Sequence, residues 1–141
     1  TIAIVPEAVS VRSHSMAQSS YILKAFATAG LRFDCNHFIP SSADIALRPW
    51  LFWDERLVRV PYHWEDDIHC QYGWEWDLHS HVRDGEINVF DFHPIHVFLN
   101  TEDLSRYEES REDHRDVNAI KTWVNHSRFG TRDFLDALMR A

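Results

Sequence analysis

Three places in the chain put polar side chains after an apolar stretch that suits a β-strand. Arg12 and His14 follow the first of these stretches, Asp66 and Asp67 the second, and His93 the third. Functional side chains of α/β folds gather at the carboxyl ends of parallel strands. A guanidinium can hold a carboxylate in place, and an imidazole can give or take a proton. We therefore expect Arg12, one of the two aspartates and His93 to meet at one edge of a sheet.

Each of these side chains also has a plainer interpretation, which the sequence leaves open. Arg12 is then a surface charge, the segment 65–67 is a solvated acidic loop, and His93 is a structural histidine bonded to the backbone. The spacing of any one residue does not decide between these interpretations. Three such groups after three apolar stretches favour a site over three coincidences.

Closely spaced histidines raise the question of a metal site. His79 and His81 would face the same side of a strand. His93 and His96 would face opposite sides, which disfavours a shared ion unless Pro94 interrupts the strand. The chain has no HExxH, CxxC or HxxxH pattern and no glycine-rich phosphate loop. Spacing alone therefore predicts no metal site within these residues.

Five of the six tryptophans lie between residues 50 and 76, and they allow two interpretations. They are Trp50, Trp53, Trp64, Trp74 and Trp76. Indole rings fill a core efficiently, so packing is the first interpretation. The second is a carbohydrate platform, in which the apolar face of a sugar stacks on indole while its hydroxyls bond to nearby carboxylates.

The composition indicates a folded protein and excludes several kinds of partner. The 141 residues are 45% hydrophobic and 13% aromatic, which suits one globular domain with a real core. The net charge of −8 argues against nucleic acid and anionic membrane surfaces as partners. No apolar run is long enough to span a membrane. Cys35 and Cys70 form no disulfide framework or zinc spacing, so we expect reduced thiols and a cytoplasmic protein.

Hydrophobic periodicity predicts an α/β architecture with about four strands. Strands are expected at 2–11 in two short pieces, 31–39, 56–64 and 87–100. Helices are expected before Gly30, with Ser15 or Ser19 as the cap, over 117–124, and from Thr131. Segment 65–86 has no clear period, and segment 101–116 is a charged loop or an exposed helix. Four strands are few for a closed barrel, although they could form part of one.

Three segments, in order, resemble motif regions of the polysaccharide deacetylases, the NodB-type family also called carbohydrate esterase family four. They are VRSHSMAQSSYILKAFATAGLRFDCNHF, LVRVPYHWEDD and VFDFHPIHVF. The first has an Arg at a strand end and a following G-L-R-F-D-C strand start, the second has Pro, Trp and acidic residues, and the third ends a strand in His-Pro. The likeness is greatest to the WbmS-like subgroup, which is associated with surface polysaccharides and O-antigen.

The resemblance implies a distorted (β/α) barrel that removes an acetyl group from a sugar with the help of a divalent, zinc-like metal. Arg12 would orient the catalytic aspartate and pair with Asp66 or Asp67. Trp64 would line the acetyl pocket, and His93 would be the general acid. His14 would also face the substrate, in a role that the resemblance leaves open.

The family's Asp-Asp and His-Ser/Thr-x-x-His motifs, which supply its base and metal ligands, are absent from residues 1–141. HSMAQ mimics the second, but Gln18 stands where the distal histidine would be. We therefore expect residues 1–141 to be one domain, the C-terminal part of a deacetylase-like barrel. Such a chain would be inactive alone and would self-associate or pair with an N-terminal half. The alternative is a non-catalytic carbohydrate-binding or scaffolding module.

Overall fold

The structure is a computed structural model that describes residues 3–52 and 56–141. Trp53, one of the tryptophans considered for a carbohydrate platform, lies outside these residues. Contacts group the chain into two compact units, residues 1–63 with 84–89 and residues 64–83 with 90–141. The expectation of one domain over residues 1–141 stays a prediction, and each unit is described here by itself.

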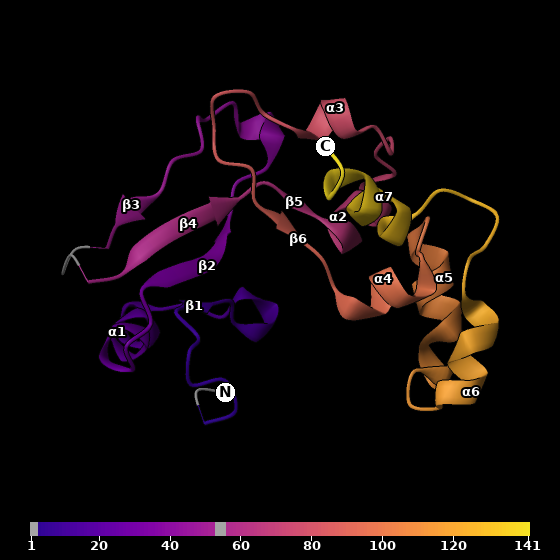
Figure 1. The fold of residues 1–141 in the computed structure, drawn as a ribbon, viewed down its shortest axis with the longest axis horizontal. Helices are drawn as coiled ribbons and strands as arrows, with labels where there is room; N and C mark the ends of the chain where they lie inside the picture. The colour runs from indigo at the N-terminus through magenta and orange to yellow at the C-terminus, as the bar shows by residue number, and fades with distance from the viewer. Residues whose placement is uncertain (1–2, 53–55) are drawn as a thin grey trace. The chain divides into compact units, whose positions relative to one another are not determined.

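The first unit contains a four-stranded sheet in the order β1-β2-β4-β3 (Figure 1). Its strands are β1 (Ser10–Val11), β2 (Phe33–Phe38), β3 (Trp50–Leu51) and β4 (Val58–Tyr62). β1, β2 and β4 are parallel, and β3 is antiparallel to β4. The register aligns Val11 with Asp34 and Asp34 with Arg59. The residues that follow β1 therefore run alongside the middle of β2.

Helix α1 (Ser20–Thr28) connects β1 to β2. Of the two serines considered as its cap, Ser19 is the one that serves, because its hydroxyl accepts a hydrogen bond from the Ile22 N–H at 3.2 Å. Leu23 turns into the core with 4% of its surface exposed. Gly30 follows the helix at φ +86°, a left-handed conformation that glycine adopts without steric cost.

The second unit combines a two-stranded parallel sheet with short helices. The strands are β5 (Trp64–Glu65) and β6 (Phe90–Asp91). The helices are α2 (Asp66–Tyr72), α3 (Leu78–His81), α4 (Pro94–Leu99), α5 (Leu104–Ser110), α6 (Val117–Ile120) and α7 (Thr131–Leu138). Turns of 3-10 helix lie at Ser41–Ala43 in the first unit, at Arg111–Asp113 and Lys121–Trp123 in the second, and at His14–Met16 after β1.

An aromatic core holds the second unit together around Trp64, which has no exposed surface. Its ring stacks on Phe134 of α7 at 4.9 Å between centroids and contacts Phe92 at the same distance. The indole N–H donates to Nδ1 of buried His69 at 3.1 Å. Burial lowers the pKa of His69 to about 4, so the ring stays neutral and can accept this bond. These contacts place the tryptophan in the core, as the packing interpretation expects.

The segment 87–100 differs from its predicted single strand, and that prediction was wrong. Only Phe90–Asp91 is β-strand, and Pro94 begins the helix α4. Proline is well tolerated at the first position of a helix because its missing N–H would have no partner there. The segment 65–86, predicted without regular structure, contains α2 and α3. In the part of the chain that the structure describes, neither sheet closes, so no barrel is seen.

Cys35 and Cys70 are both reduced cysteines. Burial, together with nearby carboxylates, raises the pKa of Cys70 to about 12, so this thiol is unreactive at neutral pH. Among the helices within residues 3–52 and 56–141, none has both the length and the apolar character needed to cross a bilayer.

The end of α4 and the start of α7 meet without room for an added methyl group. Asn100 ends α4 at φ +51°, and its Oδ1 accepts a hydrogen bond from the Arg132 N–H at 3.0 Å. Gly130 lies so close that a Cβ atom there would come within 2.4 Å of the Asn100 carbonyl oxygen. The absence of a side chain at residue 130 is therefore a requirement of this packing.

We predict that Gly130→Ala lowers the free energy of unfolding by about 1–3 kcal/mol, the usual cost of forcing an extra carbon into a packed site. Chemical denaturation measures the change. Gly73→Ala is the comparison, because a Cβ at Gly73 has open space and meets only the cost of its left-handed φ of +60°. A smaller loss for Gly130→Ala than for Gly73→Ala would contradict the argument.

Candidate active site

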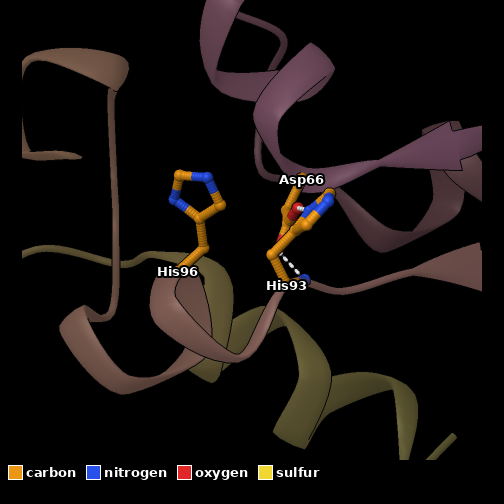
Figure 2. A group of neighbouring side chains, drawn as sticks. All are labelled: Asp66, His93 and His96. Atoms are coloured by element: carbon orange, nitrogen blue, oxygen red, sulfur yellow. Dashed lines mark hydrogen bonds and ion pairs between the residues drawn. The ribbon is translucent and has the colours of Figure 1, made fainter. Parts of the chain in front are cut away.

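Asp66 and His93 form the centre of the candidate site (Figure 2). The His93 ring donates from Nδ1 to Oδ1 of Asp66 at 2.6 Å, and the His93 backbone N–H donates to Oδ2 at 2.8 Å. Both carboxylate oxygens are thus bonded to the same residue. Asp66 has no exposed surface, whereas 31% of the His93 side chain is exposed. The carboxylate is buried, and the imidazole remains in contact with solvent.

The local fold explains how two residues 27 positions apart meet. Strands β5 and β6 are parallel neighbours, so their carboxyl ends lie at the same edge. Asp66 directly follows β5 as the first residue of α2, where the helix dipole favours a negative charge. His93 follows β6 and precedes Pro94, in an extended conformation at the start of α4. Each side chain is therefore placed by a strand-to-helix junction.

The carboxylate keeps His93 protonated. The hydrogen bond to Asp66 is the largest influence and, with the charges of Asp66, Asp67 and Asp91, raises the pKa of His93 to about 9, although partial burial opposes it. At neutral pH the ring carries a positive charge, and both of its nitrogens bear protons. Because Nδ1 is bonded to Asp66, the proton on Nε2 is the one that the ring can donate. This is the arrangement of a general acid.

His96 lies beside His93 and is held in the opposite protonation state. The two ring centroids are 5.9 Å apart and the rings are nearly perpendicular. His96 is 3% exposed, its Nδ1 is 3.1 Å from Oγ1 of Thr101, and its ring packs against Tyr107. Burial lowers the pKa of His96. In a strand the two histidine side chains would point to opposite sides. Because a helix begins at Pro94 instead, the two rings lie next to each other (Figure 2).

The resemblance implies a divalent metal, and carboxylate and imidazole groups that could ligate one lie around His93. Two groups bring three ligand atoms within 4.8 Å of one another: Asp66 with His93 and His96, and Glu65 with Asp67 and His93. Both groups need His93, which is protonated at neutral pH, and a protonated imidazole has no lone pair for a metal. Both oxygens of Asp66 already accept hydrogen bonds from His93. With His93 protonated, these residues form an acid–carboxylate pair, and a metal could bind here only by displacing the proton of His93.

The structure distinguishes the two aspartates that the sequence could not rank. Asp66 is the one bonded to His93, whereas Oδ1 of Asp67 accepts a hydrogen bond from the backbone N–H of Ile68 at 2.9 Å. Arg12 lies in the first unit, with its guanidinium carbon 5.7 Å from the centroid of the Tyr62 ring. The predicted meeting of Arg12 with an aspartate of the site stays a prediction.

The two residues expected to face the substrate have different environments. His14 is exposed and lies on the 3-10 turn after β1. Trp64 is fully buried in the aromatic core, so its predicted contact with an acetyl group stays a prediction. Asp91, whose charge acts on His93, is not among the residues that the sequence pointed to. Its position two residues before His93 in an extended segment was the signal that could have identified it.

Comparisons with known proteins identify the family of the chain. The family model for WbmS-like polysaccharide deacetylases matches residues 1–111. The chain therefore belongs to the WbmS-like polysaccharide deacetylase family.

A solved structure is similar over almost the whole chain. It is described as a polysaccharide deacetylase involved in O-antigen biosynthesis, WbmS, from Bordetella bronchiseptica. The two are 48% identical with a TM-score of 0.86, and the alignment covers 99% of this chain and 58% of the other. The chain thus spans little more than half the length of that relative. No curated protein sequence matches the chain.

We predict that Asp66→Asn lowers the pKa of His93 from about 9 toward or below the ordinary value of 6.5, because the charge and the strong acceptor are both lost. An NMR titration of the histidine Cε1 protons measures it. Asp67→Asn is the control and should lower the pKa less, since Asp67 acts only through its charge. An equal effect of the two substitutions would show that the hydrogen bond is not the main cause.

The same pair predicts how stability depends on pH. The folded-state pKa of His93 is raised from 6.5 to about 9, so the pair's contribution is fully present below pH 6.5 and is lost as the pH rises to about 9. The melting temperature of the wild type should exceed that of His93→Gln most clearly at pH 6, and the difference should shrink by pH 9. A difference that grows over this interval would reverse the sign and contradict the assignment.

Proposed function

We propose that the protein removes an acetyl group from a sugar during surface-polysaccharide biosynthesis, with His93 as the general acid. The single observation that carries this proposal is the protonated His93 held by buried Asp66, in a chain of the WbmS-like deacetylase family. The relative is described as acting in O-antigen biosynthesis, and we infer a related substrate class for this chain.

The chemistry of deacetylation explains why such a pair is useful. Water attacks the acetyl carbonyl carbon and would give a proton to a general base, which the family supplies from its upstream motifs. The tetrahedral intermediate then collapses when the bond to the sugar oxygen or nitrogen breaks. The departing alkoxide or amine needs a proton, which Nε2 of His93 supplies. Asp66 fixes the ring orientation through Nδ1 and through the backbone N–H, so little reorganisation is required at the moment of transfer.

The remaining roles follow the family resemblance. Arg12 would orient a catalytic carboxylate, Asp67 would add negative charge near His93, and His14 and Trp64 would contact the acetylated sugar. A divalent metal would polarise the carbonyl, and its ligands would lie in a part of the protein upstream of these residues. That part would also complete a distorted (β/α) barrel. The relative is longer than this chain, which covers 58% of it, so a further part of that size has a precedent.

The edge of the sheet at β1 is the place where we propose that an upstream part packs. An apolar cavity of about 600 Å³ lies there between β1 and α1, lined by residues that include Ala8, Val11, Phe26 and Leu31. An uncovered parallel sheet edge with an apolar surface is prone to pair with other chains. Residues 1–141 by themselves would therefore self-associate. Separately, we propose that the whole protein acts in the cytoplasm.

The test measures acetate release from acetylated sugars by the full-length protein. His93→Gln should lower kcat by about 10²- to 10⁴-fold, the usual contribution of a general acid. His126→Gln is the matched control, because this exposed histidine lies outside the site and should keep wild-type kinetics. Residues 1–141 alone should release no acetate.

Two results would overturn the proposal. One is an unchanged kcat in His93→Gln. The other is a full-length protein that binds acetylated saccharides but releases no acetate with any divalent metal present, which would favour a non-catalytic carbohydrate-binding module.

A further inference from the structure

A closed ring of hydrogen-bonded polar groups, two of them buried, holds the loop 12–18 that follows β1. Its central members are Asp34 and Asn36, two residues apart on β2 and each with no exposed surface. Alternate residues of a strand face the same side, so both side chains point to the same layer. Burying a polar group costs free energy unless the group has a hydrogen-bond partner. The partners of Asp34 and Asn36 therefore show which segments these two residues hold in place.

Asn36 binds both ends of the loop. Its Oδ1 accepts a hydrogen bond from the backbone N–H of Ser13 at 2.6 Å. Its backbone carbonyl oxygen accepts one from Nε2 of Gln18 at 3.1 Å. The residues between these two contacts include His14, and Arg12 directly precedes the first contact. One buried residue of β2 therefore holds both ends of the loop, one end through its side chain and the other through its backbone carbonyl.

Asp34 and Arg59 close the ring. The side-chain amide of Asn36 donates to Oδ1 of Asp34, and Nε of Arg59 donates to Oδ2 at 2.8 Å. Arg59 also donates through Nη2 to Oε1 of Gln18. The register of β2 and β4 places Arg59 opposite Asp34, so this ion pair is part of the sheet itself. The ring thus connects the loop to two strands by charge-assisted hydrogen bonds.

The loop needs such support because its backbone is strained. Ser15 and Met16 have φ values of 53° and 51°, a left-handed conformation that side chains other than glycine rarely adopt. Two consecutive residues of this kind persist only where the surroundings enforce them. Tyr62 contributes to this: its hydroxyl donates to the sulfur of Met16, and its ring lies 5.7 Å from the Arg12 guanidinium carbon.

We propose that Asn36 is a positioning residue, which with Gln18, Asp34 and Arg59 fixes the loop 12–18 in the conformation that presents Arg12 and His14 to the substrate. The expected effect of Asn36 on turnover rests on the proposed deacetylase function. The expected effect of Asn36 on the order of the loop is independent of that function. Asn36 touches neither substrate nor reacting atoms in this scheme, because it acts only through the loop.

The first test reports on the loop without any turnover. Trypsin cleaves after arginine, and the Arg12–Ser13 bond adjoins the Asn36 contact. At pH 8, Asn36→Asp and Gln18→Ala in the full-length protein should each raise the cleavage rate at this bond by about tenfold, which corresponds to the loss of one hydrogen bond. Gln71→Ala is the matched control, an exposed glutamine of α2, and should leave the rate unchanged. Wild-type cleavage rates in both ring variants would overturn the proposal.

The second test uses acetate release, with rates normalised to the folded fraction from circular dichroism. Gln18→Ala should lower kcat about tenfold and change KM little, because the loop that bears Arg12 is loosened without loss of the fold. A merely structural ring would change the folded fraction and leave the normalised kcat alone, which would overturn the positioning role. If the wild type shows no turnover at all, the deacetylase function fails, while the tryptic result still decides whether Asn36 holds the loop.

Asn36→Asp adds a readout that a structural role would not give. The introduced carboxylate faces Asp34, with Arg59 and His37 nearby, and two such carboxylates share one proton at lower pH. A protonated carboxyl can donate to Asp34 in place of the lost amide. The normalised kcat of Asn36→Asp, as a fraction of wild type, should therefore rise as the pH falls from 8 to 5.5, whereas Asn36→Leu should stay low throughout. A flat ratio for both variants would contradict the proposal.

Discussion

A buried carboxylate must be given hydrogen-bond donors or lose its charge, and this constraint shapes both units of the protein. Each oxygen of Asp66 obtains a donor from His93, one from the ring and one from the backbone, and the Asp67 N–H adds a third. Asp34 obtains its donors from Asn36 and Arg59. In each unit, one fully buried aspartate therefore determines the conformation of a segment that follows a neighbouring strand.

The two aspartates use the same physics for different ends. Arginine is a permanently charged residue type, so the ion pair of Arg59 with Asp34 can only hold a structure. Histidine changes its charge near neutral pH, so the pair of Asp66 with His93 can store a proton and release it. The neighbouring His96 has no carboxylate bonded to it and stays neutral because it is buried. Two histidines of one short helix are thus prepared for different roles by their partners alone.

Much of the fold was readable where local signals were strong. The Ser19 cap, the Gly30 stop, the strand β2 and the helix from Thr131 are all found where the sequence indicates them. The segment 87–100 was misread because a short apolar run has no period that separates strand from helix, and its only clear signal was Pro94. Helix α2 was missed because its residues, DDIHCQY, show no apolar stripe.

The site was predicted in part, because a sequence indicates where strands end but not the geometry of the side chains that follow them. Residue types after apolar stretches pointed to Asp66 and His93, because strand ends are good guides in parallel sheets. Which of two adjacent aspartates bonds to the histidine depends on the angle at which α2 begins, and a sequence does not contain that angle. The raised pKa of His93 depends on a 2.6 Å contact, so it also could not be read from residue order.

Phe134 has a consequence for where the functional part of this chain ends. The family model covers residues 1–111 and includes Asp66 and His93, yet the ring that stacks on Trp64 comes from α7, well beyond that limit. Phe134 also contacts Phe90 and Phe92, which lead directly to His93. A chain cut after residue 111, where the family model ends, would keep Asp66 and His93. It would lose Phe134 and so expose the aromatic core around Trp64. The span of the family model is thus shorter than the packed unit, whereas the similarity to the solved relative extends over almost all of it, and expression boundaries belong after Leu138.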